Sequence, residues 1–223
     1  MSAHLILAEE LMLLGHDPAT GRRIADGTGL NVATAGSLLA DLAIAERVDL
    51  DSRRVAVLSP APVGHAELDR VLAWIAAEPR QRKPEWLVSR LNKRDLPRRV
   101  QAGLAARGIM REEERKALGL FPYTRFPQLD PRPAQEIAAR MRDAISGATP
   151  TPRTAALIAL TSACRMDRKL FPDIERKVLK RRAKEISEGE WASEAVRKVI
   201  QGIQAAAAAS AAAAASASSA GSS

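Results

Sequence analysis

The chain has few of the residues that carry most enzyme chemistry. Its 223 residues include one cysteine and three histidines, and Phe, Tyr and Trp together make up only 3%. Cys164 has no partner for an internal disulfide and lies in an apolar run, so we expect a buried thiol and a reducing, cytosolic compartment. With so few rings, the core has to be built from Leu, Ile, Val and Ala, a composition that favours helices.

Patterns typical of catalytic and metal sites are also missing. The histidines are far apart and none has a second ligand at metal-binding spacing. Residues 27–29 lack the third glycine of a dinucleotide-binding loop and precede no Gly-Lys-Ser/Thr motif, so we interpret them as a turn into a helix. Glu9 and Glu10 point about 100° apart on a helix and cannot share a proton. We therefore predict a binding protein, not an enzyme, with no catalytic residue, metal or cofactor.

Long hydrophobic runs are absent as well. The longest are too short to cross a bilayer, and Glu9 and Glu10 interrupt the segment where a signal peptide would lie. Neither a myristoylation start nor a prenylation end is present. Any contact with a membrane is therefore expected to be peripheral and made by the protein surface.

Positive charge, by contrast, is concentrated in the middle of the chain. Residues 80–116 contain twelve of the 34 Lys and Arg but only five Asp and Glu, so this stretch has a net charge of +7 against +8 for the whole chain. Arg90, Arg94, Arg98 and Arg99 lie around the junction of two predicted helices, where guanidinium groups can converge on one anion. The alternative is an ordinary solvated face. Near a membrane each such charge contributes on the order of 1 kcal/mol toward an anionic surface.

An aromatic segment, residues 118–127, follows the basic stretch. Its apolar side chains are Leu120, Phe121, Tyr123 and Phe126. Because its two prolines cannot donate to a sheet, we predict an exposed hairpin, although the rings can instead seal the core beneath a loop. A basic surface beside an apolar hairpin fits a membrane face, since headgroups bind the cations and the acyl layer takes the rings.

Helical periodicity dominates the rest of the sequence and predicts a mainly α fold, with a helical-bundle core, surrounding amphipathic helices and short β-hairpins. The predicted helices cover residues 3–14, 31–45, 66–78, 84–93, 96–107, 134–146, 152–164, 173–186 and 190–204. A hairpin is predicted over residues 47–57, and residues 109–127 are interpreted as two extended arms around a polar insert at 111–116. Residues 1–204 are predicted to form a single domain. Residues 205–223, which are only Ala, Ser and one Gly, are predicted to be a disordered low-complexity tail.

Several phrases of the sequence occur in an order that is specific as a set. They are Leu7–Leu11, Ala35–Ala43 with Glu46–Leu50, Pro62–Asp69, Arg107–Glu113, Leu118–Pro127, Phe171–Pro172 and Trp191–Val196. Together they resemble the Golgi phosphoprotein 3 family, lipid-binding adaptors with members in actinobacteria. The resemblance spans nearly everything before the Ala/Ser tail.

The resemblance implies a mainly α-helical fold and a surface that binds phosphatidylinositol 4-phosphate through a Trp and several Arg, with a hydrophobic hairpin for membrane contact or self-association. Arg94 matches one of the family's arginines, and Pro97 falls on the neighbouring position. Asp26 and Ala35 stand where the family has the Trp and another Arg, so the particular lipid is left open. The hairpin at Leu120–Phe126 and the basic helix before it carry over best.

We therefore predict a cytoplasmic protein that associates peripherally with anionic, phosphoinositide-containing membranes. The alternative is a winged-helix nucleic-acid binder, because helix 96–107 followed by a hairpin is also the outline of a recognition helix and wing in a basic protein. Apolar rings at the tip count against it, since phosphate contacts there need Lys or Arg. Client proteins and a homo-oligomer formed through the hairpin stay open as partners.

Overall fold

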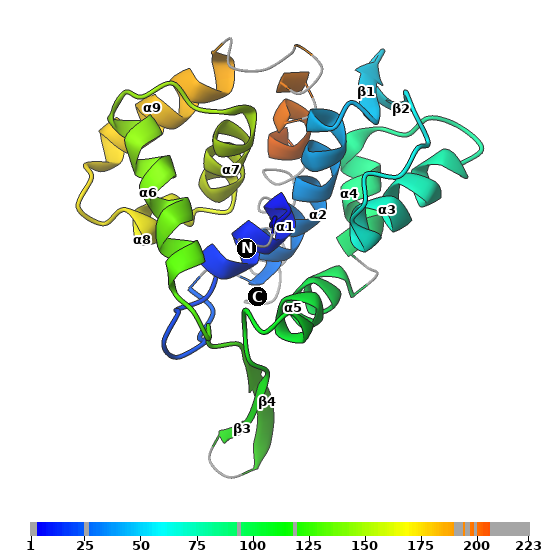
Figure 1. Ribbon diagram of the computed structural model, residues 1–223. Coiled ribbons are helices and arrows are strands. Elements are labelled where there is room, and N and C mark those ends of the chain that lie inside the picture. Colours follow the sequence, from blue (N-terminus) through cyan, green and yellow to red (C-terminus); the bar gives the residue numbers. More distant parts are fainter. Residues whose placement is uncertain are drawn as a thin grey trace, which may run out of the picture.

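The computed structural model describes residues 4–24, 27–92, 95–117, 120–189, 194, 197, 198 and 200–205. Its elements in chain order are α1 (Leu7–Leu14), α2 (Gly27–Ile44), β1 (Val48–Asp51), β2 (Arg54–Val57), α3 (Ala66–Ala76), α4 (Pro84–Asn92), α5 (Leu96–Ala106), β3 (Glu113–Ala117), β4 (Phe121–Arg125), α6 (Arg132–Ser146), α7 (Pro152–Ala163), α8 (Asp167–Leu170) and α9 (Arg176–Glu188). The described chain is mainly helical with two small antiparallel hairpins, which confirms the predicted fold class (Figure 1).

Helix α2 forms the centre of the core. It contacts α1, α3, α4, α5 and α7, and Figure 1 shows it between the α6, α7 and α9 side and the α3 and α4 side. Leu30, Leu38, Leu39 and Leu42 are fully buried, as expected for a helix covered on several faces. A Cβ added at Gly36 would lie 2.3 Å from Cγ2 of Ile203, so the helical residues near the end of the described chain pack directly on α2. The core is aliphatic, as the composition predicts, and Cys164 is buried in it as expected.

The start of α1 is set by side chains rather than by periodicity. The sequence predicts a helix from residue 3, but α1 begins at Leu7. Two carboxylates accept from the N–H groups at its start. Leu7 N donates to Asp41 Oδ2 of α2 at 2.7 Å, and Ile6 N, just before the helix, donates to Glu9 Oε2 in its first turn at 3.1 Å. Because these carboxylates cap the helix, the chain before it is free to leave the helical path.

The helix predictions from residue 31 to residue 186 agree with the structure to within a few residues. Of the helix predicted over 190–204, the described residues 194, 197, 198 and 200–204 are helical and the others lie outside the described residues, as does the predicted tail after residue 205. The helix predicted from residue 31 begins four residues earlier, at Gly27, so Asn31 lies inside α2. The short helix α8 was not predicted, and α9 begins at Arg176. Across the described residues, no helix has both the length and the apolar character needed to traverse a bilayer.

Both hairpins form, and the second corrects a prediction. In the first, β1 pairs with β2 around Ser52 and Arg53, whose φ values of 48° and 64° match the left-handed turn that suits a two-residue hairpin. In the second, the predicted polar insert is itself strand β3, paired with β4 from Glu113 opposite Arg125 to Ala117 opposite Phe121. Charged residues occupy successive β3 positions because a projecting two-stranded ribbon is solvated on both faces, so the alternation that marks a half-buried strand is missing.

Candidate functional site

The β3–β4 hairpin projects from the helical body, and hydrogen bonds hold its base in place (Figure 1). Arg111 N donates to Pro127 O at 2.9 Å, and Leu129 N donates to Ile109 O at 3.0 Å, which pairs the two chains below the strands. Gln128 N donates to Pro18 O at 2.9 Å, so the loop after α1 also packs on the base. The ribbon therefore has a fixed base and an extended tip.

Close contact between this loop and the hairpin base requires glycine at position 21. Gly21 has φ +63°, and a Cβ built on it would lie 2.4 Å from Pro127 N. Such a separation is far below van der Waals contact, so any larger residue would force the two segments apart. The position of the hairpin relative to the body therefore depends on Gly21.

Phe126 lies at the hairpin base and not at the tip. Its side chain is only 7% exposed, and its ring meets that of His16 edge-on, with the ring centres 6.3 Å apart. The prediction that Phe126 enters a membrane interface is therefore wrong. Phe126 follows the end of β4, where the chain has returned to the body, and there it seals the core as the alternative interpretation of the rings required.

The exposed apolar part of the hairpin is its outer half. Leu120 is 78% exposed and Tyr123 is 37% exposed, and the guanidinium carbon of Arg125 lies 5.2 Å from the centre of the Tyr123 ring. The side chain of Phe121 is outside the described residues. Leu120 and Tyr123 are thus the predicted hairpin residues that the structure places in contact with solvent.

Charged residues lie below this tip on β3. Arg115 Nη2 and Glu113 Oε2 are 2.7 Å apart, and Arg111 also pairs with Glu113. Hydrogen bonds from Arg115 and then Arg111 hold the pKa of the Glu113 carboxyl below its ordinary value. The Glu113 carboxylate therefore pairs with two arginines at once, and the net charge of the described part of the hairpin stays positive.

Of the four arginines predicted to bind one anion, the structure describes Arg90, Arg98 and Arg99, and two of these have partners within the protein. On α5, Arg98 is exposed and takes part in none of the ion pairs between described residues. Arg99 is bound to Glu67 of α3, with Nη2 2.7 Å from Oε1 and Nε 3.3 Å from Oε2. Arg94 lies outside the described residues.

Arg90, the fourth of these arginines, belongs to an aromatic cluster on α3 and α4. Its guanidinium carbon lies 5.2 Å from the centre of the Trp86 ring, and that of Arg82 lies 4.4 Å from it. Trp86 in turn stacks on Trp74, with ring centres 6.1 Å apart and an angle of 13° between the planes. Trp74 and Trp86 therefore pack between α3 and α4, and Trp191 lies outside the described residues.

A second group of cations lies beside the hairpin base and was missed in the sequence. Arg22, Arg23 and Lys169 line a pocket of about 410 Å³, together with Asp17, Thr20 and Ile24. Lys169 Nζ donates to Ile24 O, which fixes α8 against the loop after α1. These residues are distant in sequence from the basic stretch, and the only local signal is a pair of arginines in a Gly- and Pro-containing loop.

Cations thus lie beside the base of the hairpin, on the loop after α1 and on α5, whereas the apolar tip projects beyond them. Figure 1 shows the loop after α1 on one side of the hairpin base and α5 on the other. The backbone bonds of Gln128 to the loop and of Ile109 to Leu104 in α5 agree with this view. The site that the structure supports is therefore wider than predicted, and it is built from three chain segments.

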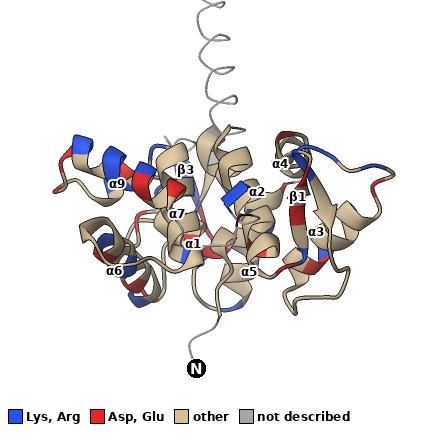
Figure 2. Cartoon of the chain, turned by 90° about the horizontal axis from the view of Figure 1, so that it is seen from above, with Lys and Arg blue, Asp and Glu red and all other residues tan. Residues whose placement is uncertain are grey.

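A further basic run, on α9, forms a solvated helix face. Figure 2 shows Lys and Arg along this helix, and its apolar side is turned inward, with Leu179 only 3% exposed. Arg182 pairs with Glu185, and Lys184 Nζ lies 3.9 Å from Glu188 Oε1. The charges on α9 are therefore partly compensated within the helix.

Glu9 and Glu10 belong to a buried ion network that the sequence did not reveal. Both are almost completely buried, as is Asp41. Arg153 binds Asp41 at 2.7 Å and Glu10 at 3.1 Å. Arg107 of the α5 C-terminus binds Glu9 at 2.7 Å. Burial raises the pKa of Asp41 to about 7, against the attraction of Arg153.

This network joins helices that are far apart in the sequence. Glu9 binds Arg107 and Glu10 binds Arg153, so each glutamate is paired with an arginine from a different part of the chain. Within the described ranges, no group of three or more His, Cys, Asp or Glu side chains is placed to hold a metal ion.

Comparison with known proteins gives one family match. A family model described as Golgi phosphoprotein 3 (GPP34) matches residues 7–203, which extend from α1 to the helical residues that pack on α2. A search of curated proteins found no match for the chain.

Proposed function

Since the chain belongs to the Golgi phosphoprotein 3 (GPP34) family, a family of non-enzymatic, Golgi-associated adaptors, we propose that it binds membranes peripherally through the hairpin end of the molecule. The resemblance predicted from the sequence is confirmed by this match. The proposed ligands are anionic headgroups of the phosphatidylinositol 4-phosphate type. The observation that carries the proposal is the exposure of Leu120 at the tip of a hairpin. The base of that hairpin is fixed and has cations beside it.

The hairpin supplies the apolar part of the proposed contact. Full burial of a leucine side chain is worth roughly 1.5–3 kcal/mol, so Leu120 together with the half-exposed Tyr123 gives a modest, reversible insertion. Tyr123 suits the boundary between headgroups and acyl chains, because its ring is apolar and its hydroxyl stays hydrated. A tip of this size needs electrostatic help to hold the protein on a bilayer.

The flanking cations supply that help in the proposal. Arg98 on α5 is exposed, and Arg22, Arg23 and Lys169 surround the pocket on the other side of the hairpin. Guanidinium groups bind phosphate oxygens in pairs, which favours phosphomonoester headgroups over a diffuse negative surface. Binding of this kind weakens as salt screens the charges.

The family's own lipid pocket is only partly represented in this chain. Ala35, at one family arginine position, is completely buried in α2 and has no access to a headgroup. Asp26 and Arg94 lie outside the described residues. Arg22, Arg23 and Lys169 lie beside the base of the β3–β4 hairpin. We propose that these three cations make the headgroup contacts for which the family's residues are missing in this chain.

Cosedimentation with vesicles tests this function, with one charge reversal on α5 and a control reversal on α9. Arg98→Glu should weaken binding to phosphatidylcholine vesicles that contain phosphatidylinositol 4-phosphate, without changing thermal stability. Lys177→Glu, which reverses an exposed charge on α9, is the control and should bind like the wild type. Equal binding to vesicles of phosphatidylcholine alone, or no loss in Arg98→Glu, would reject the proposal.

Nucleic-acid binding remains the alternative, and the same variants address it. A duplex DNA of random sequence should not be shifted at physiological salt if the exposed Leu120 tip serves a bilayer, since a wing tip needs Lys or Arg for phosphate. A shift that Arg98→Glu abolishes, with no vesicle binding, would favour the nucleic-acid function.

A further inference from the structure

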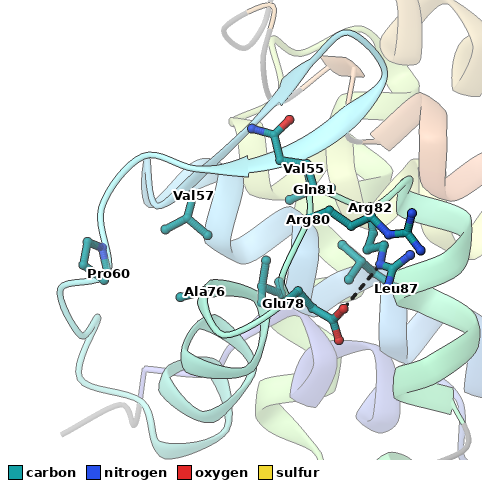
Figure 3. Close-up of a pocket in the computed structure, with 10 residues that line it drawn as sticks. Val55, Val57, Pro60, Ala76, Glu78, Arg80, Gln81, Arg82 and Leu87 are labelled. Atoms are coloured by element: carbon teal, nitrogen blue, oxygen red, sulfur yellow. Dashed lines mark hydrogen bonds and ion pairs between the residues drawn. The ribbon is translucent and has the colours of Figure 1, made fainter.

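A second pocket lies on another side of the molecule from the β3–β4 hairpin. It has a volume of about 330 Å³ and is lined by Val55, Val57, Pro60, Ile75, Ala76, Glu78, Arg80, Gln81, Arg82 and Leu87. Figure 3 shows it between strand β2, which carries Val55 and Val57, and the end of α3 at Ala76. In Figure 1 the β1–β2 hairpin is at the upper right and β3–β4 is at the bottom, so a bilayer on the β3–β4 end leaves this pocket uncovered.

The strand beside the pocket has an open hydrogen-bonding edge. Asp51 and Arg54 are the hydrogen-bonded pair that closes the two-residue turn. In an antiparallel pair of strands, hydrogen-bonded and non-hydrogen-bonded residue pairs alternate along the strands from that point. Two observed bonds fix the pattern: Leu58 N donates to Arg47 O within the hairpin, and Val55 N donates outward to Arg82 O, both at 2.8 Å. Val57, two residues after Val55, therefore also directs its N–H and C=O outward.

The outward groups of Val57 are available to a ligand. Arg82 forms a single β-bridge with Val55 of β2, and residues 78–80 form a bend instead of continuing as a strand along β2. Among the hydrogen bonds between described residues, none uses the N–H of Val57. An unpaired edge of this kind is a template for another strand.

The pocket next to this edge has an apolar floor. Val55, Ile75 and Leu87 are each no more than 6% exposed, and Val57 and Pro60 complete one wall. The volume falls at the lower end of the range for small-ligand clefts, about 300–1,000 Å³. It therefore suits an aliphatic side chain and not a large ring system.

The rim of the pocket is cationic. Arg82 is held by Glu78 at 3.3 Å and by the Trp86 ring, as the dashed line in Figure 3 marks for Glu78. Arg80 is exposed and takes part in none of the ion pairs found among the described residues. Arg54 Nη1 donates to Gln81 O at 3.0 Å, which adds a further positive charge beside the rim. A carboxylate is the group that complements Arg80.

We propose that this pocket docks an extended peptide that adds to the edge of β2. The peptide would exchange main-chain hydrogen bonds with Val57, place an aliphatic side chain on the Val55, Ile75 and Leu87 floor, and direct a neighbouring carboxylate to Arg80. Strand addition of this type takes affinity from the main chain and specificity from the side-chain pocket. The proposal goes beyond the membrane function, because it assigns a protein partner to a surface that the bilayer leaves free.

Three synthetic peptides test the mode of binding on the full chain. The probe is a fluorescein-labelled seven-residue peptide of alternating leucine and glutamate, followed by fluorescence anisotropy. Replacing glutamate by lysine should abolish binding, because the rim is cationic. Methylating the backbone nitrogens of the leucine–glutamate peptide should weaken binding at least about tenfold, as expected for the loss of a main-chain hydrogen bond.

Two variants test the location. Val57→Pro removes the outward N–H from an edge position where proline is tolerated, and Arg80→Glu reverses the rim charge. Each should weaken peptide binding at least about tenfold, whereas Lys177→Glu on α9 should bind like the wild type. Both pocket variants should bind vesicles normally, so failure here is distinguishable from failure of the membrane function.

Several results would overturn the proposal. Equal affinity for the glutamate and lysine peptides would remove the role of Arg80, and full affinity of the methylated peptide would show that an apolar anion binds without forming a strand. Wild-type affinity in Val57→Pro would place the peptide elsewhere. If Val57→Pro is unfolded by circular dichroism, the methylated peptide on the unchanged chain decides the question.

Discussion

The imidazole of His16 lies edge-on to the ring of Phe126, with 6.3 Å between the ring centres and 74° between the planes. His16 Nδ1 lies 2.8 Å from Met12 O and therefore donates to it, which leaves Nε2 to accept from the Gln101 amide at 3.1 Å. One buried side chain thus joins α1, α5 and the hairpin base. The direction in which the hairpin projects depends on this contact.

Phe126→Ala should destabilise the protein by about 3 kcal/mol, the lower end of the range for truncating a buried phenylalanine. It should also loosen the hairpin base, because His16 loses its contact with the Phe126 ring. Chemical denaturation monitored by circular dichroism measures the first effect. Tyr123→Ala, at the exposed part of the same hairpin, is the control and should change stability little. Equal losses in the two variants would mean that Phe126 is not part of the core.

His16 should make stability depend on acid. Burial lowers its pKa below 6.5, chiefly by desolvation, so the unfolded chain takes up this proton more readily than the folded protein. The contribution of His16 is therefore fully present above pH 6.5 and declines as the pH falls from 6.5 toward the folded-state pKa. His16→Gln, which does not titrate, should lose less stability than the wild type between pH 7 and pH 5. Unfolding curves measured across that range check this, and parallel losses would exclude His16 as the source.

Asp41 should act in the opposite direction. Burial raises its pKa from 3.8 to about 7, so the folded protein keeps this proton over a range in which the unfolded chain has lost it. The stabilising contribution of Asp41 is then greatest below pH 3.8 and declines as the pH rises toward 7. The stability difference between wild type and Asp41→Asn should therefore shrink from pH 5 to pH 8. A difference that grows with pH would instead show that the ionised carboxylate, paired with Arg153, is the favoured form.

The spacing of apolar residues was sufficient to predict most of the helices. The stripe of Leu68, Val71, Leu72 and Ile75 predicted α3, and all four are buried, because apolar residues at helical spacing can be buried together only on one face of a helix. The β1–β2 hairpin was predicted by alternation and confirmed. The position of the β3–β4 turn was not, since a ribbon solvated on both faces imposes no alternation on its sequence.

The composition of the site could not be read from local pattern. Arg90, Arg98 and Arg99 are close in sequence, yet Trp86 holds the first and Glu67 the third, and both partners are chosen by helix packing. Arg22 and Arg23 joined the hairpin end only because Gly21 allows their loop to lie against the hairpin base. Burial of Glu9 and Glu10 likewise depends on arginines more than ninety residues away in the sequence. Neither the position of Arg22 and Arg23 nor the burial of the two glutamates is therefore visible in the local sequence.

Leu120→Asp gives the most direct test of the hairpin tip. Leu120 is 78% exposed, so the substitution removes no core contact and thermal stability should stay within about 0.5 kcal/mol of the wild type. In the proposed membrane contact the same change puts a carboxylate among acyl chains and anionic headgroups, which opposes insertion both by desolvation and by repulsion. Vesicle binding should therefore fall at least about tenfold, as expected when more than about 1.4 kcal/mol of insertion energy is lost. Leu58→Asp is the matched control, because Leu58 is 60% exposed and follows β2, which lies away from the β3–β4 hairpin in Figure 1. If both variants lose binding equally, the apolar tip has no special role, and the cations beside it account for the attraction.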